Sequence, residues 1–329
     1  MFLDLVRKAG EDDPELARAA LEGLRAYQAA PRPPRHRALP VIARRDGSSL
    51  ADHGGEGPPV VLVPSLINPP RILDLDSQVS LADAVARMGH HSLLLDWGKA
   101  SERRDLSVAG HIEQRLLPLL QDLGEPPVLI GYCLGGTMAI AAASHAPLAG
   151  LVTLAAPWDF AAYPAAARAS LKQLWASAEP SARELGLLPI EVLQAAFWSL
   201  DPERTVRKFA RFAQLEPSSA EARRFVEMEE WANQGEPVPY PAGAELIEGL
   251  FGANLSGRGE WQVSGRPAGV PDGLPALHVT ASDDRIVPAA TAPPGTALAL
   301  PSGHVGMVVG SARTRLHQAI AEFLALRVP

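Results

Sequence analysis

The sequence has very little cysteine: Cys133 is the only one in 329 residues. One cysteine excludes a disulfide framework within the chain and a metal site built from several thiolates. Long apolar runs are also missing, since no stretch approaches the roughly 18 residues of a membrane-spanning helix. The first ten residues carry Asp4, Arg7 and Lys8 where a secretory signal is apolar. We therefore expect a cytoplasmic protein without a transmembrane segment, a compartment that suits a free thiol.

An excess of positive charge is absent as well. The chain has 30 Lys and Arg against 37 Asp and Glu, a formal net charge of −7. Nucleic-acid binders neutralise phosphates with basic side chains, so we expect no nucleic-acid partner. Hydrophobic residues make up 47% and charged residues 20%, proportions typical of a globular chain rather than a disordered one. The length allows two domains, or one large domain with an insertion.

Short apolar runs and helical patterns alternate along most of the chain. Buried strands are expected at residues 60–63, 91–95, 127–130, 151–155, 276–280 and 297–300, and helices at 11–30, 81–88, 112–123, 134–145 and 312–326. This alternation predicts an α/β fold, a mostly parallel doubly wound sheet with helices on both faces. Between residues 158 and 255 the pattern is helical, with no convincing buried strand. We predict an N-terminal helical segment (1–45), a core (46–157 and 256–329) and a mainly helical cap insertion (158–255).

The sequence Gly131-Tyr-Cys-Leu-Gly-Gly136 lies where an expected strand meets an expected helix. Its spacing is that of the nucleophile elbow G-x-S-x-G, with cysteine in the place of serine. Such a turn exposes the nucleophile at a helix N-terminus, where the helix dipole favours a thiolate. We predict that Cys133 is a nucleophile, and that the N–H groups of Leu134 and of Leu66 or Ile67 bind the oxyanion. The alternative is that Cys133 is a small packing residue beside glycines that helix–sheet contact requires.

An acid and a histidine follow the elbow in the order that this motif requires. Asp283 and Asp284 come just after the expected strand at 276–280, and we prefer Asp284, which directly precedes Arg-Ile-Val-Pro. His304 follows the next strand on a loop with glycines on both sides. We predict that His304 is the general base and that Asp284 orients it. Asp96, at the end of an earlier strand, is the competing acid.

Taken together, these motifs resemble those of the polyhydroxyalkanoate synthases. The resemblance is carried by the elbow, by Pro-Ser-Leu-Ile-Asn-Pro-Pro-Arg-Ile-Leu-Asp-Leu (64–75), by Asp-Trp-Gly (96–98), by Asp-Arg-Ile-Val-Pro (284–288) and by Gly-His-Val-Gly (303–306). It implies the α/β-hydrolase fold and a Cys–His–Asp triad. The chain lacks the long N-terminal domain of single-subunit synthases, and its length is nearer that of the short synthases, which need a second subunit.

The resemblance also implies an activity, namely polymerisation of (R)-3-hydroxyacyl-CoA through a thioester on Cys133. Coenzyme A is then part of the substrate, and we expect no other cofactor and no metal. Implied partners are acyl-CoA, a hydrophobic polymer granule, and either a second synthase subunit or a second copy of the chain. Four arginines are candidates for contacts with coenzyme A, although solvated surface positions suit them better: Arg71, Arg103, Arg104 and Arg285. The alternatives are a hydrolase with the same triad (a thioesterase or an intracellular depolymerase) and a non-catalytic subunit that binds a synthase or a granule.

Overall fold

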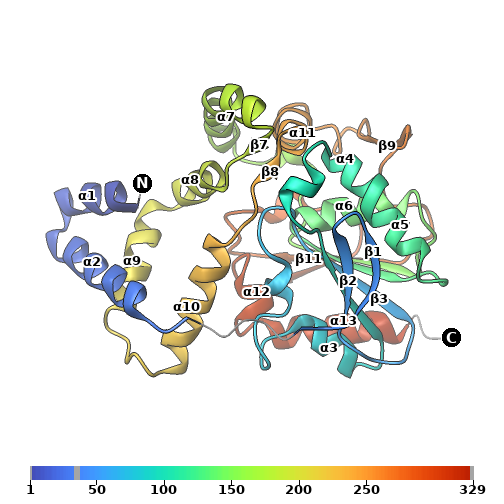
Figure 1. The fold of residues 1–329 in the computed structure, drawn as a ribbon, viewed down its shortest axis with the longest axis horizontal. Coiled ribbons are helices and arrows are strands. Elements are labelled where there is room, and N and C mark those ends of the chain that lie inside the picture. Colours follow the sequence, from blue (N-terminus) through green and yellow to red (C-terminus); the bar gives the residue numbers. More distant parts are fainter. Residues whose placement is uncertain (1, 33–37, 327–329) are drawn as a thin grey trace. The chain divides into compact units, whose positions relative to one another are not determined.

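The computed structural model describes residues 2–32 and 38–326, and it contains an eight-stranded sheet (Figure 1). Its strand order is β1-β2-β4-β3-β5-β6-β11-β12, in which β1 and β2 pair antiparallel and the strands from β4 to β12 run parallel. The strands are β1 (Val41–Arg45), β2 (Ser48–Asp52), β3 (Pro59–Val63), β4 (His91–Asp96), β5 (Val128–Tyr132), β6 (Gly150–Leu154), β11 (Ala276–Ala281) and β12 (Ala297–Leu300). The predicted α/β architecture is confirmed.

The middle of the sheet is apolar because helices cover both of its faces. Every residue of β3, β5 and β6 is buried, as expected for parallel strands enclosed on two sides. Register aligns their carboxyl ends, with Val63 opposite Gly131 and Gly131 opposite Thr153. Chain segments that leave these strands therefore emerge side by side at one edge of the sheet.

The covering helices lie in two layers. On one face α3 (Leu81–Arg87) contacts α13 (Arg313–Ala325), and on the other α6 (Leu134–Ala143) packs over β3, β5 and β6 (Figure 1). The π-helix η3 (Ile112–Leu116) contacts α6 and lies between α4 (Val108–His111) and α5 (Leu117–Gln121). The remaining elements around the sheet are η1 (Pro70–Leu73), η2 (Ala100–Arg103), η4 (Phe160–Ala162), α7 (Ala165–Leu185), β7 (Leu187–Leu188), β8 (Val238–Pro239), α11 (Tyr240–Ala244), the π-helix η5 (Glu245–Gly252), β9 (Gln262–Val263), β10 (Arg266–Pro267), η6 (Ala289–Thr291) and α12 (Gly306–Val309).

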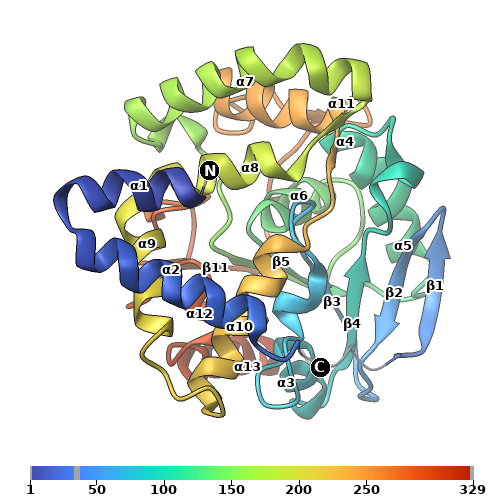
Figure 2. The same ribbon diagram turned by 60° about the vertical axis from the view of Figure 1, so that its left-hand side comes forward.

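The chain divides into two compact units, one of which is built from two distant stretches. The helical unit comprises Met1–Arg37 and Glu191–Gly235, and the sheet unit comprises Ala38–Ile190 and Glu236–Pro329. In the helical unit α2 (Pro14–Ala29) packs along α9 (Pro202–Phe212), and α1 (Phe2–Asp12) contacts both of them (Figure 2). Two further helices are α8 (Ile190–Leu200) and α10 (Ala220–Asn233).

Apolar and polar contacts explain why these distant stretches pack together. Val6, Ala20 and Phe209 share one buried cluster. At the edge of the unit the Tyr27 hydroxyl donates a hydrogen bond of 2.6 Å to Glu230 Oε1. Burial of such side chains removes apolar area from water, the dominant favourable term in folding.

These boundaries differ from the predicted parts of the chain. The predicted N-terminal helical segment (1–45) ends in a strand, because Val41–Arg45 pairs with β2 as the outer strand of the sheet. The predicted insertion (158–255) is divided between the two units, since residues 191–235 pack with the N-terminal helices. It also contains two short strands, β7 and β8, which pair antiparallel. Within the described residues no helix is long and apolar enough to cross a membrane.

Candidate active site

Cys133 lies at the sharp turn between β5 and α6, and its backbone is strained. Its φ of 56° and ψ of −130° fall in a region that residues other than glycine rarely adopt. Such a conformation costs on the order of 1–3 kcal/mol and persists only where the surroundings enforce it. Here the Cys133 N–H donates to Leu154 O at 2.9 Å, while the Cys133 carbonyl accepts from the Gly136 N–H at 2.9 Å. The turn therefore presents the thiol at the N-terminus of α6, half-exposed.

Close backbone contacts account for the glycines around the thiol. A Cβ on Gly131 would lie 2.4 Å from Gly136 Cα, and a Cβ on Gly135 would lie 2.2 Å from Val63 O and 2.5 Å from Pro64 O. Real Cβ atoms do not approach backbone atoms so closely. The helix therefore begins in direct contact with the end of β3, and this contact places the loop after β3 beside Cys133.

His304 and Asp284 form a buried hydrogen-bonded pair. His304 lies on the loop between β12 and α12, and Asp284 lies on the turn that follows β11. His304 Nδ1 is 2.7 Å from Asp284 Oδ2, and the exposed fractions of the two side chains are 6% and 0%. Asp284 Oδ1 is occupied separately, because it accepts from the N–H groups of Ile286 and Val287, each at 2.8 Å. One carboxylate oxygen thus fixes the turn and the other holds the imidazole.

Several neighbours act on the charge of His304. Burial by itself lowers its pKa, but the charge of Cys133 and hydrogen bonds to Asp284 and Cys133 outweigh burial and raise the pKa from 6.5 to about 10. Since Nδ1 faces Asp284, Nε2 is the ring nitrogen left for Cys133. The arrangement favours a protonated imidazole next to the thiol at neutral pH, which is how cysteine nucleophiles are activated.

Two buried tyrosines border this group. The rings of Tyr132 and His304 pack at a tilt of 33° with centroids 5.0 Å apart, and the Tyr132 hydroxyl donates to His304 O at 3.4 Å. Burial raises the pKa of Tyr132 and of Tyr163 well above 10, and the charges of Cys133 and Asp284 raise both further. Tyr163 follows η4, so the segment after β6 also contributes a wall near the thiol.

The predicted oxyanion donors lie in two segments next to the elbow. Leu134 is the first residue of α6, where backbone N–H groups have no partner inside the helix. In the loop after β3 the Ile67 N–H donates to Ser65 Oγ at 3.3 Å, whereas the Leu66 N–H has no hydrogen-bond partner among residues 2–32 and 38–326. Of the two loop residues, Leu66 is therefore the one with a free donor.

Trp97 fixes the start of this loop, a contact that the sequence motifs did not reveal. Its indole Nε1 donates to Pro64 O at 2.9 Å, and the residue is 4% exposed. The ring of His111 packs edge-on against the indole at a centroid distance of 5.7 Å. Burial lowers the pKa of His111 to about 3, so this neighbour is uncharged. The Asp-Trp-Gly motif thus supports the loop through its tryptophan.

The other candidate acids are exposed, and two of the candidate arginines bond to backbone carbonyls. Asp96 is exposed and accepts from the Gly98 N–H at 2.9 Å, and Asp283 is exposed next to Asp284. Arg103 is 3% exposed rather than solvated, with Nε on Gly98 O at 3.3 Å and Nη1 on His111 Nε2 at 3.2 Å. Arg104 donates to Leu185 O. Arg103 therefore serves the structure of the sheet unit, whereas Arg104 is exposed, as expected of a surface arginine.

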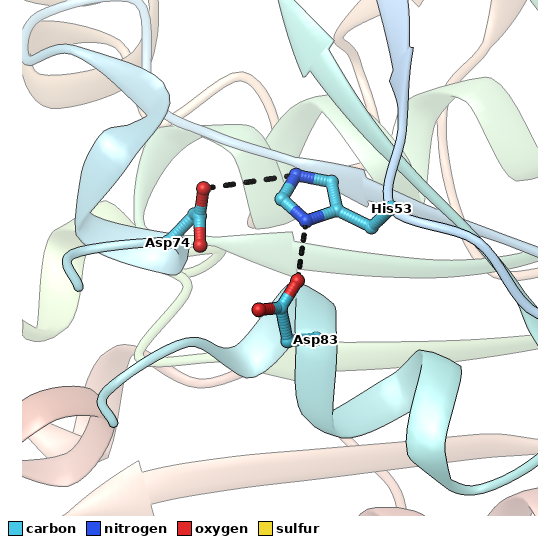
Figure 3. Close-up of side chains that lie close together, drawn as sticks. All are labelled: His53, Asp74 and Asp83. Carbon is cyan, nitrogen blue, oxygen red and sulfur yellow. Dashed lines mark hydrogen bonds and ion pairs between the residues drawn. The ribbon is translucent and has the colours of Figure 1, made fainter. Parts of the chain in front are cut away.

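A second cluster, His53, Asp74 and Asp83, was not singled out by the sequence (Figure 3). His53 Nδ1 is 2.9 Å from Asp83 Oδ1, and Nε2 on the opposite side of the ring is 3.9 Å from Asp74 Oδ2. One ligand atom from each of the three residues lies within 4.8 Å of the other two, which gives at most three protein ligands, one fewer than a structural zinc site has. The cluster joins the residue after β2 and the residue after η1 to α3.

Comparison with known proteins gives a consistent result. A family model described as the alpha/beta hydrolase fold matches residues 58–311. Poly(3-hydroxyalkanoate) polymerase subunit PhaC of Haloarcula marismortui is 25% identical over 312 residues, covering 87% of this chain and 64% of that protein. The subunit of the same name from Allochromatium vinosum is 25% identical over 289 residues, covering 81% of this chain and 80% of that protein. These matches confirm the resemblance to polyhydroxyalkanoate synthases.

The lengths of the relatives and one solved structure are also informative. The chain spans 64% and 59% of the relatives from Haloarcula marismortui and Haloferax mediterranei. Among solved structures, a candidate aryl esterase from Burkholderia cenocepacia superposes with a TM-score of 0.50 at 15% identity, covering 88% of this chain and 99% of that one. At that identity the superposition supports the fold alone.

Proposed function

This chain belongs to the alpha/beta hydrolase fold family, and on that premise we propose that it is a polyhydroxyalkanoate synthase-like acyltransferase. It would join (R)-3-hydroxyacyl units from coenzyme A thioesters into a polyester. The observation that supports the proposal most directly is the buried pair of His304 and Asp284, 2.7 Å apart, with Cys133 at the strained elbow on the other side of the imidazole. Similarity to polymerase subunits supports the choice of substrate.

In the first half of the proposed reaction Cys133 takes the acyl group. The sulfur, whose proton His304 Nε2 holds, attacks the thioester carbonyl carbon, and the negative charge moves to the carbonyl oxygen. The N–H groups of Leu134 and Leu66 bind this oxyanion. When the tetrahedral intermediate collapses, coenzyme A leaves with the proton from His304, and Cys133 carries the acyl chain as a thioester.

In the second half the acyl group passes to an alcohol. Neutral His304 takes the proton of a 3-hydroxyl as its oxygen attacks the enzyme thioester. Collapse forms the ester bond and expels the Cys133 thiolate next to the newly protonated imidazole, which restores the starting state. Asp284 accepts the Nδ1–H throughout and stabilises the imidazolium. A thioester suits this exchange, because it reacts with alcohols and releases a good leaving group.

The location and the partners of the protein are part of the same proposal. A synthase that makes a hydrophobic polyester works at the surface of its product, so we place the protein in the cytoplasm at a polymer granule. The curated relatives are named as polymerase subunits, which supports a second subunit or a second copy of this chain as partner. The part of the predicted insertion that belongs to the sheet unit, including Tyr163 and α7, would keep water from the acyl-enzyme.

Incubation of the purified protein with (R)-3-hydroxybutyryl-CoA tests the function. Free coenzyme A and the size of the acyl product are followed together, with Cys133→Ala as the matched control. Polymer that depends on Cys133 supports the synthase. Release of monomeric acid at the same rate as coenzyme A would instead make the protein a hydrolase. Coenzyme A release that is absent, or equal in Cys133→Ala, would overturn the proposed chemistry.

A further inference from the structure

The sheet unit contains a cavity of about 620 Å³ beside the candidate active site. It is lined by the N-terminal half of α7 and by the π-helix η5, with Trp175, Ile247 and Phe251 among the lining side chains. Its volume lies within the range of small-molecule sites, roughly 300–1,000 Å³. Its walls are largely apolar, with few polar groups, which is also typical of such sites.

Aromatic side chains connect this cavity to the thiol. Phe251 lines the cavity, and its ring centroid is 4.8 Å from that of Tyr163. Tyr163 is close enough to Cys133 and Asp284 for their charges to act on its hydroxyl. The chain segment that leads to Tyr163 is held to α6, because the Thr137 hydroxyl donates a hydrogen bond to Pro157 O at 2.6 Å. Tyr163 and Phe251 therefore lie between the cavity and the nucleophile.

The polar part of the cavity wall is positively charged. Arg168 and Lys172 stand one helical turn apart on α7 and both line the cavity. Arg168 Nε is buried without a hydrogen-bond partner, and neither side chain forms an ion pair with any residue that the structure describes. The acidic lining residue, Glu248, is engaged by Trp175 Nε1 at 2.7 Å. The first turn of α7 adds the partial positive charge of a helix N-terminus.

We infer that this cavity binds the phosphate-bearing pantetheine arm of the acyl-CoA substrate. The inference rests on the proposed function and adds to it the place where coenzyme A lies. Apolar walls suit the pantetheine chain, and Arg168 and Lys172 suit its phosphates. With the thioester at Cys133, the arm passes Tyr163 and Phe251 and reaches the two cations.

Two thioesters of the same acyl group provide the test. One is (R)-3-hydroxybutyryl-CoA, and the other is the N-acetylcysteamine thioester, which lacks the phosphates and most of the arm. The ratio of their kcat/KM values is measured for the unchanged protein, for Arg168→Gln, for Lys172→Gln and for the double variant. We expect the ratio to fall about tenfold in the double variant, through a higher KM for the coenzyme A thioester. Arg183→Gln is the control, since Arg183 is on the same helix, outside the cavity, paired with Glu179.

The outcomes separate this inference from the proposed function. A ratio that is unchanged in Arg168→Gln and Lys172→Gln overturns the inference while leaving the function intact, and so does equal loss with both thioesters. If neither thioester reacts with the unchanged protein, the proposed function fails. Calorimetric binding of free coenzyme A then tests the cavity by itself, and affinity that is equal in the double variant rejects it. Lys172 is exposed, so its substitution leaves the fold intact.

Discussion

Replacement of Asp284 by asparagine isolates the effect of one carboxylate oxygen on His304. Asparagine keeps the oxygen that accepts from Ile286 and Val287, so the turn after β11 is preserved. The other oxygen, 2.7 Å from His304 Nδ1, becomes an N–H₂ group that cannot accept the Nδ1–H. The variant thus loses both the charge and the acceptor that favour the protonated imidazole.

The size of the effect follows from the geometry of the pair. A buried hydrogen bond to a charged group contributes about 1.5–3 kcal/mol. At 1.36 kcal/mol for each pKa unit, its loss lowers the pKa of His304 by about 1 to 2 from its native value of about 10. The imidazole of His304 therefore loses its proton at a lower pH in the variant than in the unchanged protein. We expect kcat/KM to fall by about 10- to 150-fold and its alkaline limb to move down by about 1 to 2 pH units.

Alkylation of the protein gives a direct measurement, because Cys133 is the only cysteine in the chain. Iodoacetamide adds one carbamidomethyl group, and intact mass gives its rate at each pH. We expect alkylation at neutral pH to slow in Asp284→Asn, while the exposed neighbour Asp283→Asn matches the unchanged protein. Identical alkylation profiles for Asp284→Asn and Asp283→Asn, with both variants folded, would refute the role given to Asp284.

Stability should depend on pH through the same histidine. The folded-state pKa of His304 is raised, so its contribution to the free energy of unfolding is full below the unfolded value of about 6.5. It is lost as pH rises through about 10. We expect the difference in unfolding free energy between the unchanged protein and Asp284→Asn to be largest near pH 6 and to shrink toward pH 10, measured by urea denaturation. A difference that grows with pH over this range would contradict the assignment.

Three further predictions concern the elbow and its support. Gly135→Ala should destabilise the protein by roughly 3 kcal/mol in denaturant unfolding, because its Cβ would lie 2.2 Å from a backbone oxygen, whereas Gly269→Ala, with nothing within 4 Å, should be nearly neutral. Cys133→Gly should be more stable than Cys133→Ala by about 1 kcal/mol, since only glycine relieves the positive φ, and equal stability would argue against strain. Trp97→Phe should lower kcat about tenfold with KM nearly unchanged, because the loop after Pro64 loses its anchor, and an unchanged kcat would remove Trp97 from loop support.

The interior of the sheet was predictable from the sequence because its strands are covered on both faces. Val-Val-Leu-Val at 60–63 and the runs before the elbow are uniformly apolar, and the structure makes them β3 and β5. The two antiparallel strands at one edge of the sheet, β1 and β2, were not predicted. In Val41–Arg45 only Ala43 is buried, and Ser48–Asp52 mixes polar and apolar residues, so neither shows an apolar run. Their pairing depends on the sheet beside them.

The candidate site was likewise predictable from the sequence only in part. The order elbow, acid, histidine led to the prediction of Cys133, Asp284 and His304, and each of them follows a strand whose carboxyl end lies at the same edge. Contacts that depend on loop conformation carried no sequence signal. The bond between Ile67 N–H and Ser65 Oγ and that between Trp97 and Pro64 O are of this kind.

The packing of the helical unit has a consequence for how the chain folds during translation. A Cβ on Gly23 would lie 1.9 Å from Phe209 O, so the backbones of α2 and α9 are in direct contact. These two positions are 186 residues apart in the sequence (209 − 23). At a translation rate of about 5–20 residues per second, α9 leaves the ribosome about 10–40 s after α2. During that interval the apolar side of α2 has no native partner within its own unit. The nascent N-terminus is therefore a site where a chaperone can bind, and slower translation between residues 30 and 200 should increase misfolding before it affects the finished enzyme.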